Sequence, residues 1–228
     1  MRFERAKNYD EFATAQKKAA ADLSELLTKQ IHAADKIYEI GCGSGIFTQH
    51  ILKEISFKEL TLNDLYKSLP MEKYPSQIGD ICTLEIPKNL NLIVSSSVLQ
   101  WIDDLNSLFQ KIDDSLFEKG MFAFAMFTNG TLFELERFTH QGLAYKTPDE
   151  ICSLLKNHFE ILDSKENFCT LQFENLFALL DSLKQTGVNN LDGNFHLTKS
   201  NFKELEKSFD GKFNLTYRYL VVVCKKFN

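Results

Sequence analysis

The sequence lacks the features that mark membrane, secreted and metal-binding proteins. No apolar run approaches the roughly 20 residues of a membrane-spanning helix, and the charged N-terminus has no signal-peptide stretch. The five cysteines are scattered, odd in number and never spaced as CxxC, which argues against a disulfide framework and a zinc site. The five histidines form no ligand-spaced cluster with cysteine or acid. We therefore expect a cytoplasmic protein that contacts no membrane and binds no metal ion.

Basic residues are too few to suggest a nucleic-acid-binding protein. The 26 lysines and arginines are outnumbered by 31 acidic residues, and the net charge is −5 at pH 7, whereas nucleic-acid binding needs clustered positive charge. The hydrophobic fraction of 44% and the charged fraction of 25% are those of an ordinary globular protein. Because no Pro/Gly/Ser-rich linker, repeat or low-complexity segment divides the chain, we expect one domain over residues 1–228.

Strand-like and helix-like segments alternate along the chain. Short apolar or β-branched runs predict strands, and apolar residues at helical spacing predict helices. The expected strands are 36–40, 59–62, one around 78, 90–95, 121–127 and 217–224, and the expected helices are 10–28, 46–55, 103–117 and 148–159. This order predicts an α/β fold with a doubly wound, mostly parallel sheet and helices on both of its faces.

The strongest chemical signal is a glycine-rich loop, Glu39-Ile-Gly-Cys-Gly-Ser-Gly45, between an expected strand and an expected helix. Gly41 and Gly43 would let the backbone turn tightly and approach a ligand, and Gly45 would let the helix pack close to the strand. Such a loop lies where open α/β sheets bind ligands. It lacks the ending of a phosphate-binding P-loop and departs from G-x-G-x-x-G, so a phosphate or dinucleotide fits less well. The alternative is an ordinary strand-to-helix turn.

Acidic residues follow the next two expected strands. Asp64 ends the second strand, 19 residues after Gly45. A carboxylate there can accept hydrogen bonds from both hydroxyls of a ribose, although it could also cap a helix. Asp80, in Gly79-Asp80-Ile81, follows the third strand, and by itself such a dipeptide is a common turn.

The pattern E-x-G-x-G-x-G resembles the first motif of the class I methyltransferases. The resemblance implies a Rossmann-like fold with an antiparallel C-terminal strand, S-adenosyl-L-methionine as cofactor and S-adenosyl-L-homocysteine as product. It implies that Asp64 holds the ribose hydroxyls, that Asp80 accepts from the adenine amino group, and that Ile81 covers the ring. The other residues that it assigns to this part of the cofactor site are Glu39, Gly41, Cys42, Gly43, Gly45 and Leu65.

Segments outside the loop are similar to the malonyl-acyl-carrier-protein O-methyltransferases of biotin synthesis. Residues 95–105, SSSVLQWIDDL, resemble the signature S-N-x-x-x-Q-W-x-x-x-L, with Ser96 where the pattern usually has Asn. The similarity covers almost the whole chain. The further matching residues and segments are Phe3, Ala6, Tyr9, Asp10, Gln16, 130–135, 182–188 and 215–217.

This resemblance implies methyl ester formation on the free carboxylate of a malonyl thioester, carried by acyl carrier protein or coenzyme A. Residues 1 to about 30 would form a helical lid, from which Tyr9 and Gln16 face the cofactor. Ser96 and Gln100 would contact the cofactor as well, and about 128–147 would form a substrate lid. A carboxylate is already ionised at pH 7, so no general base is needed.

Candidates for positioning the acceptor are Tyr9, Trp101 and Arg137. We expect one cation to bind the carboxylate; Arg137 is favoured, Lys146 is a second candidate, and Arg2 and Arg5 are alternatives on the N-terminal segment. Each has a structural interpretation too: Tyr9 and Trp101 could pack in the core, and Arg137 could pair with Glu134 at i,i+3 spacing.

Three other functions remain open from the residues. The nearest is a methyltransferase for another small carboxylic acid of the aconitate type. The others are a nicotinamide-dependent oxidoreductase and a non-catalytic adaptor that retains the fold. The intact glycine loop, Asp64 and Asp80 argue against an adaptor.

Overall fold

The computed structural model describes residues 9–140, 143–186 and 198–227. Arg2, Phe3, Arg5, Ala6 and the last two residues of the 182–188 motif lie outside these ranges. The strands are β1 (Lys36–Ile40), β2 (Glu59–Asp64), β3 (Ser76–Ile78), β4 (Leu90–Ser96), β5 (Leu116–Phe127), β6 (Phe159–Phe173) and β7 (Phe213–Lys226). The helices are α1 (Tyr9–Phe12), α2 (Thr14–Thr28), α3 (Ile46–Glu54), α4 (Leu105–Ser115), α5 (Phe133–Thr139), α6 (Pro148–Leu155), α7 (Leu176–Gln185) and α8 (Lys199–Ser208), with 3-10 turns η2 (Leu69–Glu72) and η3 (Leu99–Trp101).

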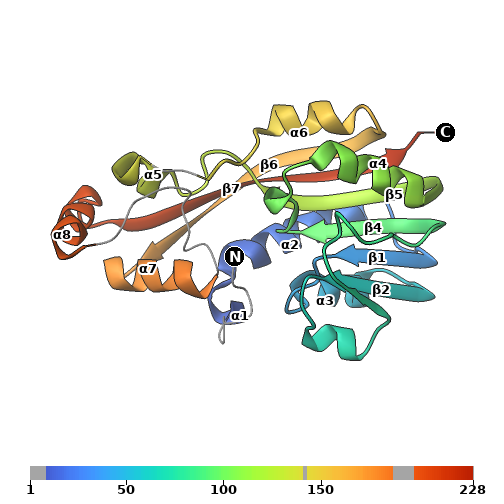
Figure 1. Ribbon diagram of the computed structural model, residues 1–228, viewed down its shortest axis with the longest axis horizontal. Coiled ribbons are helices and arrows are strands. Elements are labelled where there is room, and N and C mark those ends of the chain that lie inside the picture. The colour runs from blue at the N-terminus through green and yellow to red at the C-terminus, as the bar shows by residue number, and fades with distance from the viewer. Residues whose placement is uncertain (1–8, 141–142, 187–197, 228) are drawn as a thin grey trace.

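Within the described residues, the strands form one sheet in the order β3-β2-β1-β4-β5-β7-β6 (Figure 1). Strands β1 to β5 are parallel to their neighbours, whereas β7 is antiparallel to β5, and β6 to β7. The strand order reverses between β1 and β4, and ligands of open α/β sheets bind at such a switch point. The predicted doubly wound sheet with an antiparallel C-terminal strand is confirmed.

Helices cover both faces of the sheet. Alternate residues of a buried strand point to opposite faces, so each strand contributes side chains to both layers. In β5, Phe122 and Phe124 belong to a cluster with α4 and α6, whereas Ala123 and Ala125 belong to a cluster with α2, α3 and α7. In Figure 1, α4 and α6 lie in the upper part of the picture, and α3 and α7 lie in the lower part. None of the described helices combines the length and apolarity needed to cross a membrane.

Several predicted boundaries were wrong. The helix expected over 10–28 is interrupted at Ala13, which separates α1 from α2. The helix expected over 103–117 ends at Ser115, because Leu116 already pairs with Leu90 of β4. The helix expected over 148–159 ends at Leu155, and Phe159 begins β6, a strand that was not predicted.

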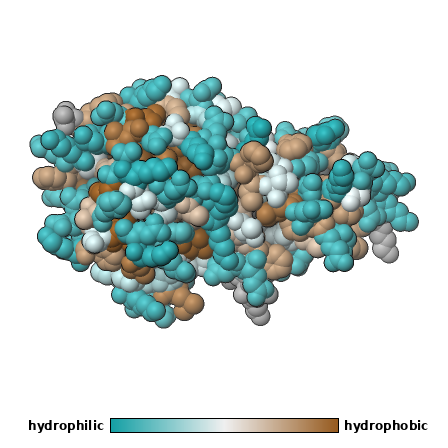
Figure 2. All heavy atoms as spheres, turned by 180° about the vertical axis from the view of Figure 1, so that it is seen from behind, coloured by the Kyte–Doolittle hydropathy of each residue, from teal (hydrophilic) through white to brown (hydrophobic). Residues whose placement is uncertain are grey.

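Strands β6 and β7 form a ribbon that projects past the parallel part of the sheet. β5 pairs with β7 only as far as Phe127, opposite Tyr219, while β6 stays paired with β7 down to Phe213. The ribbon therefore continues beyond the carboxyl end of β5, toward α5, α7 and α8 at the left of Figure 1. Seen from behind in Figure 2, this part is the narrower half of the molecule, and polar side chains cover much of both halves.

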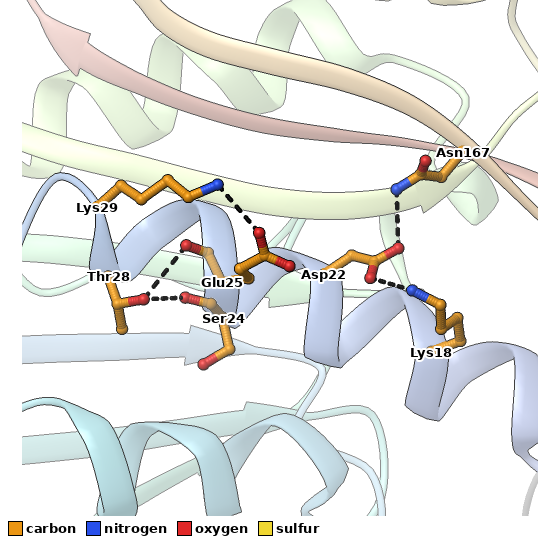
Figure 3. Close-up of polar contacts among 7 residues, drawn as sticks. All are labelled: Lys18, Asp22, Ser24, Glu25, Thr28, Lys29 and Asn167. Carbon is orange, nitrogen blue, oxygen red and sulfur yellow. Dashed lines mark hydrogen bonds and ion pairs between the residues drawn. The ribbon is translucent and has the colours of Figure 1, made fainter.

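An acidic side chain on α2 ties this helix to the ribbon. Asp22 accepts hydrogen bonds from the Tyr219 hydroxyl (2.6 Å) and the Asn167 amide (2.8 Å), and it pairs with Lys18. Figure 3 shows the Lys18 and Asn167 contacts converging on Asp22, away from the separate Lys29–Glu25 pair. Partial burial opposes ionisation, but the bonds from Lys18 and Tyr219 hold the pKa of Asp22 below its usual value. This anchor fixes α2, and with it α1, relative to the projecting ribbon.

Candidate functional site

The glycine loop joins β1 to α3 at the switch point of the sheet. Gly41 and Gly43 have φ angles of +70° and +52°, in the left-handed region that favours glycine. A Cβ on Gly41 would lie 2.3 Å from Val98 Cγ2, whereas a Cβ on Gly43 would meet nothing within 4 Å. The close approach at Gly45 was expected to be to the strand, but its Cβ would meet Pro70 Cγ of η2 at 2.7 Å. The open space at Gly43 is suited to a ligand that approaches the backbone.

Asp64 lies directly beside this loop, at the end of β2. Its Oδ2 accepts from the Gly43 backbone N–H (2.8 Å), and its Oδ1 accepts from the Tyr66 N–H (3.2 Å). These two bonds hold the half-buried carboxylate in one orientation, and each oxygen keeps lone-pair capacity for another donor. The loop and the acid thus lie side by side at the carboxyl end of the parallel strands.

The loop containing Asp80 packs against the end of β2. The Gly79 N–H donates to the Asp64 carbonyl (2.9 Å), and the Asn63 amide donates to the Gly79 carbonyl (3.1 Å). The Lys111 ammonium of α4 donates to the Ile81 carbonyl (2.8 Å) and to that of Cys82. Ile81 is buried and Asp80 is exposed. Sequence reasoning missed Asn63 and Lys111, because neither contacts this loop locally in sequence.

Glu39, the acidic residue that opens the glycine motif, is buried below the loop at 1% exposure. Its Oε2 accepts from the Thr48 hydroxyl of α3 at 2.7 Å, so the pair bridges the strand and helix that flank the loop. Burial raises the pKa of Glu39 to about 7, and nearby Asp64 adds to this against the Thr48 hydrogen bond. Through its bond to Thr48, Glu39 connects the two elements that flank the glycine loop.

Replacing Glu39 by glutamine is expected to change the pH dependence of stability. Because the pKa of Glu39 is raised from 4.5 to about 7 in the folded chain, the unfolded chain loses this proton at a lower pH than the folded chain does. The free energy of unfolding therefore falls as pH rises between those values, by at most about 1.4 kcal/mol per pH unit, and Glu39→Gln removes this fall. Denaturant titrations at pH 5 to 8, with exposed Glu85→Gln as control, measure it; equal slopes for wild type and Glu39→Gln would contradict it.

Unpartnered polar atoms gather at the carboxyl end of β4. Among the described residues, the hydroxyl oxygens of Ser96 and Ser97 and the Oε1 of Gln100 are buried without a hydrogen-bond partner. The Gln100 amide nitrogen donates to the Ser97 carbonyl (2.7 Å), which fixes the direction of its oxygen. Ser97 also has a positive φ of 61°. Buried polar groups without partners cost about 1–3 kcal/mol each, so this arrangement suits a polar ligand.

A cavity opens beside these atoms. Trp101 and Tyr145 meet edge to face in its wall, with ring centroids 5.4 Å apart. Among the described residues that line it, none is a lysine, arginine, aspartate or glutamate. Its lining residues are Tyr9, Gln16, Ser97, Gln100, Trp101, Phe127, Thr131, Leu143, Tyr145, Thr186 and Tyr217. The part of its wall that the described residues form is therefore uncharged and consists of aromatic rings, hydroxyls, amides and aliphatic side chains.

The structure brings four predicted residues, Tyr9, Gln16, Gln100 and Trp101, into this cavity. Arg137 lies on α5, exposed, and is not among the lining residues. The residues not brought to the cavity wall also include Lys146, whose backbone carbonyl accepts from Asn129, and Leu65, which is 53% exposed.

The sequence offered a pairing of Arg137 with Glu134 as the alternative, but in the structure Glu134 bonds to Thr216. Its Oε1 accepts from the Thr216 hydroxyl at 2.7 Å, and its Oε2 accepts from the Thr216 N–H at 3.1 Å. These bonds attach α5 to the projecting part of β7. They leave Arg137 on the exposed side of a helix whose anchor is Glu134.

Sequence reasoning assigned no site role to several lining residues, among them Ser97, Phe127, Tyr145, Thr186 and Tyr217. A signal existed for Tyr217, because it ends the 215–217 motif that lies far from the glycine loop. Its role depends on the path of β7, which no local pattern reveals.

A parallel sheet with a glycine loop after β1 and a carboxylate beside it after β2 has the architecture of a class I methyltransferase. The family described as a methyltransferase domain matches residues 9–163. A 1,6-didemethyltoxoflavin-N1-methyltransferase of Burkholderia thailandensis, solved with bound S-adenosylhomocysteine, has a TM-score of 0.59 at 15% identity, over 100% of this chain and 84% of that one. This likeness concerns the fold.

Two curated relatives narrow the assignment. A malonyl-[acyl-carrier protein] O-methyltransferase of Bacteroides thetaiotaomicron is 32% identical, over 99% of this chain and 96% of its own length. One of Calditerrivibrio nitroreducens is 34% identical, over 93% of this chain and 87% of its own length. The chain belongs to the malonyl-[acyl-carrier protein] O-methyltransferase family.

Proposed function

We propose that the protein transfers a methyl group from S-adenosylmethionine to the free carboxylate of malonyl-acyl carrier protein, an early step of pimeloyl and biotin synthesis. The observation that carries this is the identity of 32% over nearly the full chain with a protein of that name. The match spans the glycine loop and also the ribbon and helices that wall the cavity. An aconitate-type acid is the alternative acceptor.

The residues at the switch point suit the cofactor, which supplies an electrophilic methyl group on a sulfonium. Asp64 would accept from the ribose hydroxyls, and Asp80 and Ile81 would hold the adenine. Gly43 leaves room for the ligand beside the backbone. The buried, unpartnered oxygens of Ser96 and Gln100 offer hydrogen bonds to the polar methionine end.

The chain's contribution to the reaction would be alignment and exclusion of water. The acceptor carboxylate needs no base at pH 7, so the oxygen, the methyl carbon and the sulfur must be held in line. Tyr9 and Trp101 line the cavity and would position the acceptor. We propose that the N-terminal segment acts as a lid through Tyr9 and Gln16, since the rest of α2 packs in the core. Residues 128–147 would cover the acceptor, and Arg137 and Lys146 stay sequence-based predictions.

Malonyl-coenzyme A would be a second acceptor, because it presents the same malonyl thioester. We expect no binding to nucleic acid, given the net charge of −5. The five cysteines are all free thiols in the structure, in keeping with a reducing compartment such as the cytoplasm.

Labelled S-adenosylmethionine provides the decisive assay. We expect label transfer to malonyl-acyl carrier protein and malonyl-coenzyme A, and none to acetyl thioesters or aconitate. Because acetyl thioesters lack only the free carboxylate, their failure as acceptors would identify that group as the nucleophile. Binding of the cofactor without transfer to any malonyl thioester would refute the acceptor assignment and leave the fold and cofactor site standing.

A further inference from the structure

We propose that the malonyl carboxylate is received in the cavity by uncharged hydroxyl donors, with the Tyr217 hydroxyl as the principal one, and not by Arg137 or Lys146. This inference rests on the proposed function, since it concerns how the same cavity recognises its acceptor. Among the described residues, these donors take the place of the cation that the sequence led us to expect.

The position of Tyr217 follows from the ribbon. Tyr219 is the partner of Phe127, the last residue of β5, so Tyr217 is the next residue of that face of β7 beyond the parallel sheet. Its ring is buried at 3% exposure and packs on Phe127, with centroids 5.7 Å apart. It lines the cavity. A phenolic hydroxyl that reaches a cavity can donate a hydrogen bond to a ligand oxygen.

Electrostatic neighbours place this hydroxyl close to the cofactor site. Burial is the main cause that raises the pKa of Tyr9, and Asp10 and Asp64 add to it. Burial likewise raises the pKa of Tyr217, with contributions that include Tyr9. Tyr9 thus interacts electrostatically with both Asp64 and Tyr217. Both phenols remain protonated at working pH and can donate to an anion.

Other hydroxyls of the cavity are already engaged. Thr131 donates to the Arg218 carbonyl (2.8 Å), and Thr186 donates to the Ser182 carbonyl (2.9 Å). The Ser97 hydroxyl, by contrast, is buried without a partner among the described residues. Tyr217, Tyr9 and Ser97 are the hydroxyls that we assign as donors to the carboxylate, which prefers such charge-assisted bonds.

The reaction itself favours an uncharged cavity. The carboxylate oxygen forms a bond to the methyl carbon while the carbon–sulfur bond breaks and its electron pair stays on sulfur, so one negative and one positive charge disappear together. A fixed cation would bind the charged ground state more tightly than the less charged transition state and would slow the transfer. Phenolic and alcoholic donors orient the carboxylate with a smaller penalty of this kind.

The ribbon supplies a matched pair of variants. Tyr217→Phe removes the proposed donor and keeps the ring, whereas Tyr219→Phe removes a hydroxyl that bonds to Asp22 (2.6 Å) on the same strand. We expect Tyr217→Phe to raise the KM for malonyl thioester about tenfold or more, with the Kd of S-adenosylmethionine unchanged within about twofold. Tyr219→Phe should lower the melting temperature and leave that KM unchanged.

A neutral ligand tests recognition of the charge. In malonamyl thioester an amide replaces the carboxylate. For the wild type, its inhibition constant should be higher than the Kd of malonyl thioester. The ratio of the two constants should be smaller for Tyr217→Phe. If Tyr217→Phe is too unstable to assay, Ser97→Ala should show a smaller shift of the same kind. An unchanged malonyl KM in both variants, or a tenfold rise in Arg137→Gln with none in Tyr217→Phe, would overturn the inference. Wild-type protein that binds the cofactor but methylates no malonyl thioester would instead refute the proposed function.

Discussion

Replacement of Asp64 by alanine is expected to raise the Kd of S-adenosylmethionine at least about a hundredfold. The carboxylate is held by the Gly43 and Tyr66 N–H groups, in an orientation that leaves lone pairs for two ribose hydroxyls. A hydrogen bond to a charged group contributes about 1.5–3 kcal/mol, so losing two of them exceeds the 2.7 kcal/mol that corresponds to roughly a hundredfold. Isothermal titration calorimetry measures the change directly.

Glu118→Ala is the control for Asp64→Ala. Glu118 is an exposed acid near the amino end of β5, whereas the glycine loop lies at the carboxyl ends of the parallel strands. Its replacement changes the net charge by the same amount as Asp64→Ala does. Its Kd should match the wild type. A Kd for Asp64→Ala within about threefold of the wild type would show that the ribose is not held by this residue.

Gly41→Ala is expected to destabilise the fold by about 2–5 kcal/mol and to weaken cofactor binding more than tenfold. The left-handed φ of +70° costs a residue with a Cβ about 1–2 kcal/mol. The new Cβ would also lie 2.3 Å from Val98 Cγ2, and such overpacking adds about 1–3 kcal/mol. Movement of the loop away from Val98 would relieve this overlap and would displace the loop's backbone from the ligand.

Two further variants separate the causes of this destabilisation. Gly43 has a φ of +52°, and a Cβ added there would lie in open space. In denaturant titrations, Gly43→Ala should therefore lower the free energy of unfolding by the conformational cost alone. Val98→Ala removes the atoms that Gly41→Ala would strike, so the double variant should recover at least about 1 kcal/mol relative to additivity. Strict additivity would show that the overlap with Val98 is not the cause.

The position of the candidate cofactor residues was predictable because its signals are local. Gly41, Asp64 and Asp80 each follow an expected strand, and parallel strands bring their carboxyl ends to one edge of the sheet. Gln100 follows β4 at that same edge.

The acceptor side was predicted less well, because its walls come from pairing between distant segments. Strand β6 carries many charged and polar residues and alternates between half-buried and exposed positions, so no apolar run announced it. It is held by its backbone ladder with β7. Arg137, favoured for its charge and its place after β5, lies on the exposed side of α5, since Glu134 anchors that helix to Thr216.

The sequence alone determined the α/β class, the glycine loop, its acidic partners and the family resemblance. Each of these depends on residues that are close together in the chain. Only the folded chain decides that β6 and β7 extend past β5, and that Tyr9, Trp101 and Tyr217 line one cavity. The physical reason is that strand pairing and side-chain burial are set by segments far apart in sequence, and their energy exists only once those segments are in contact.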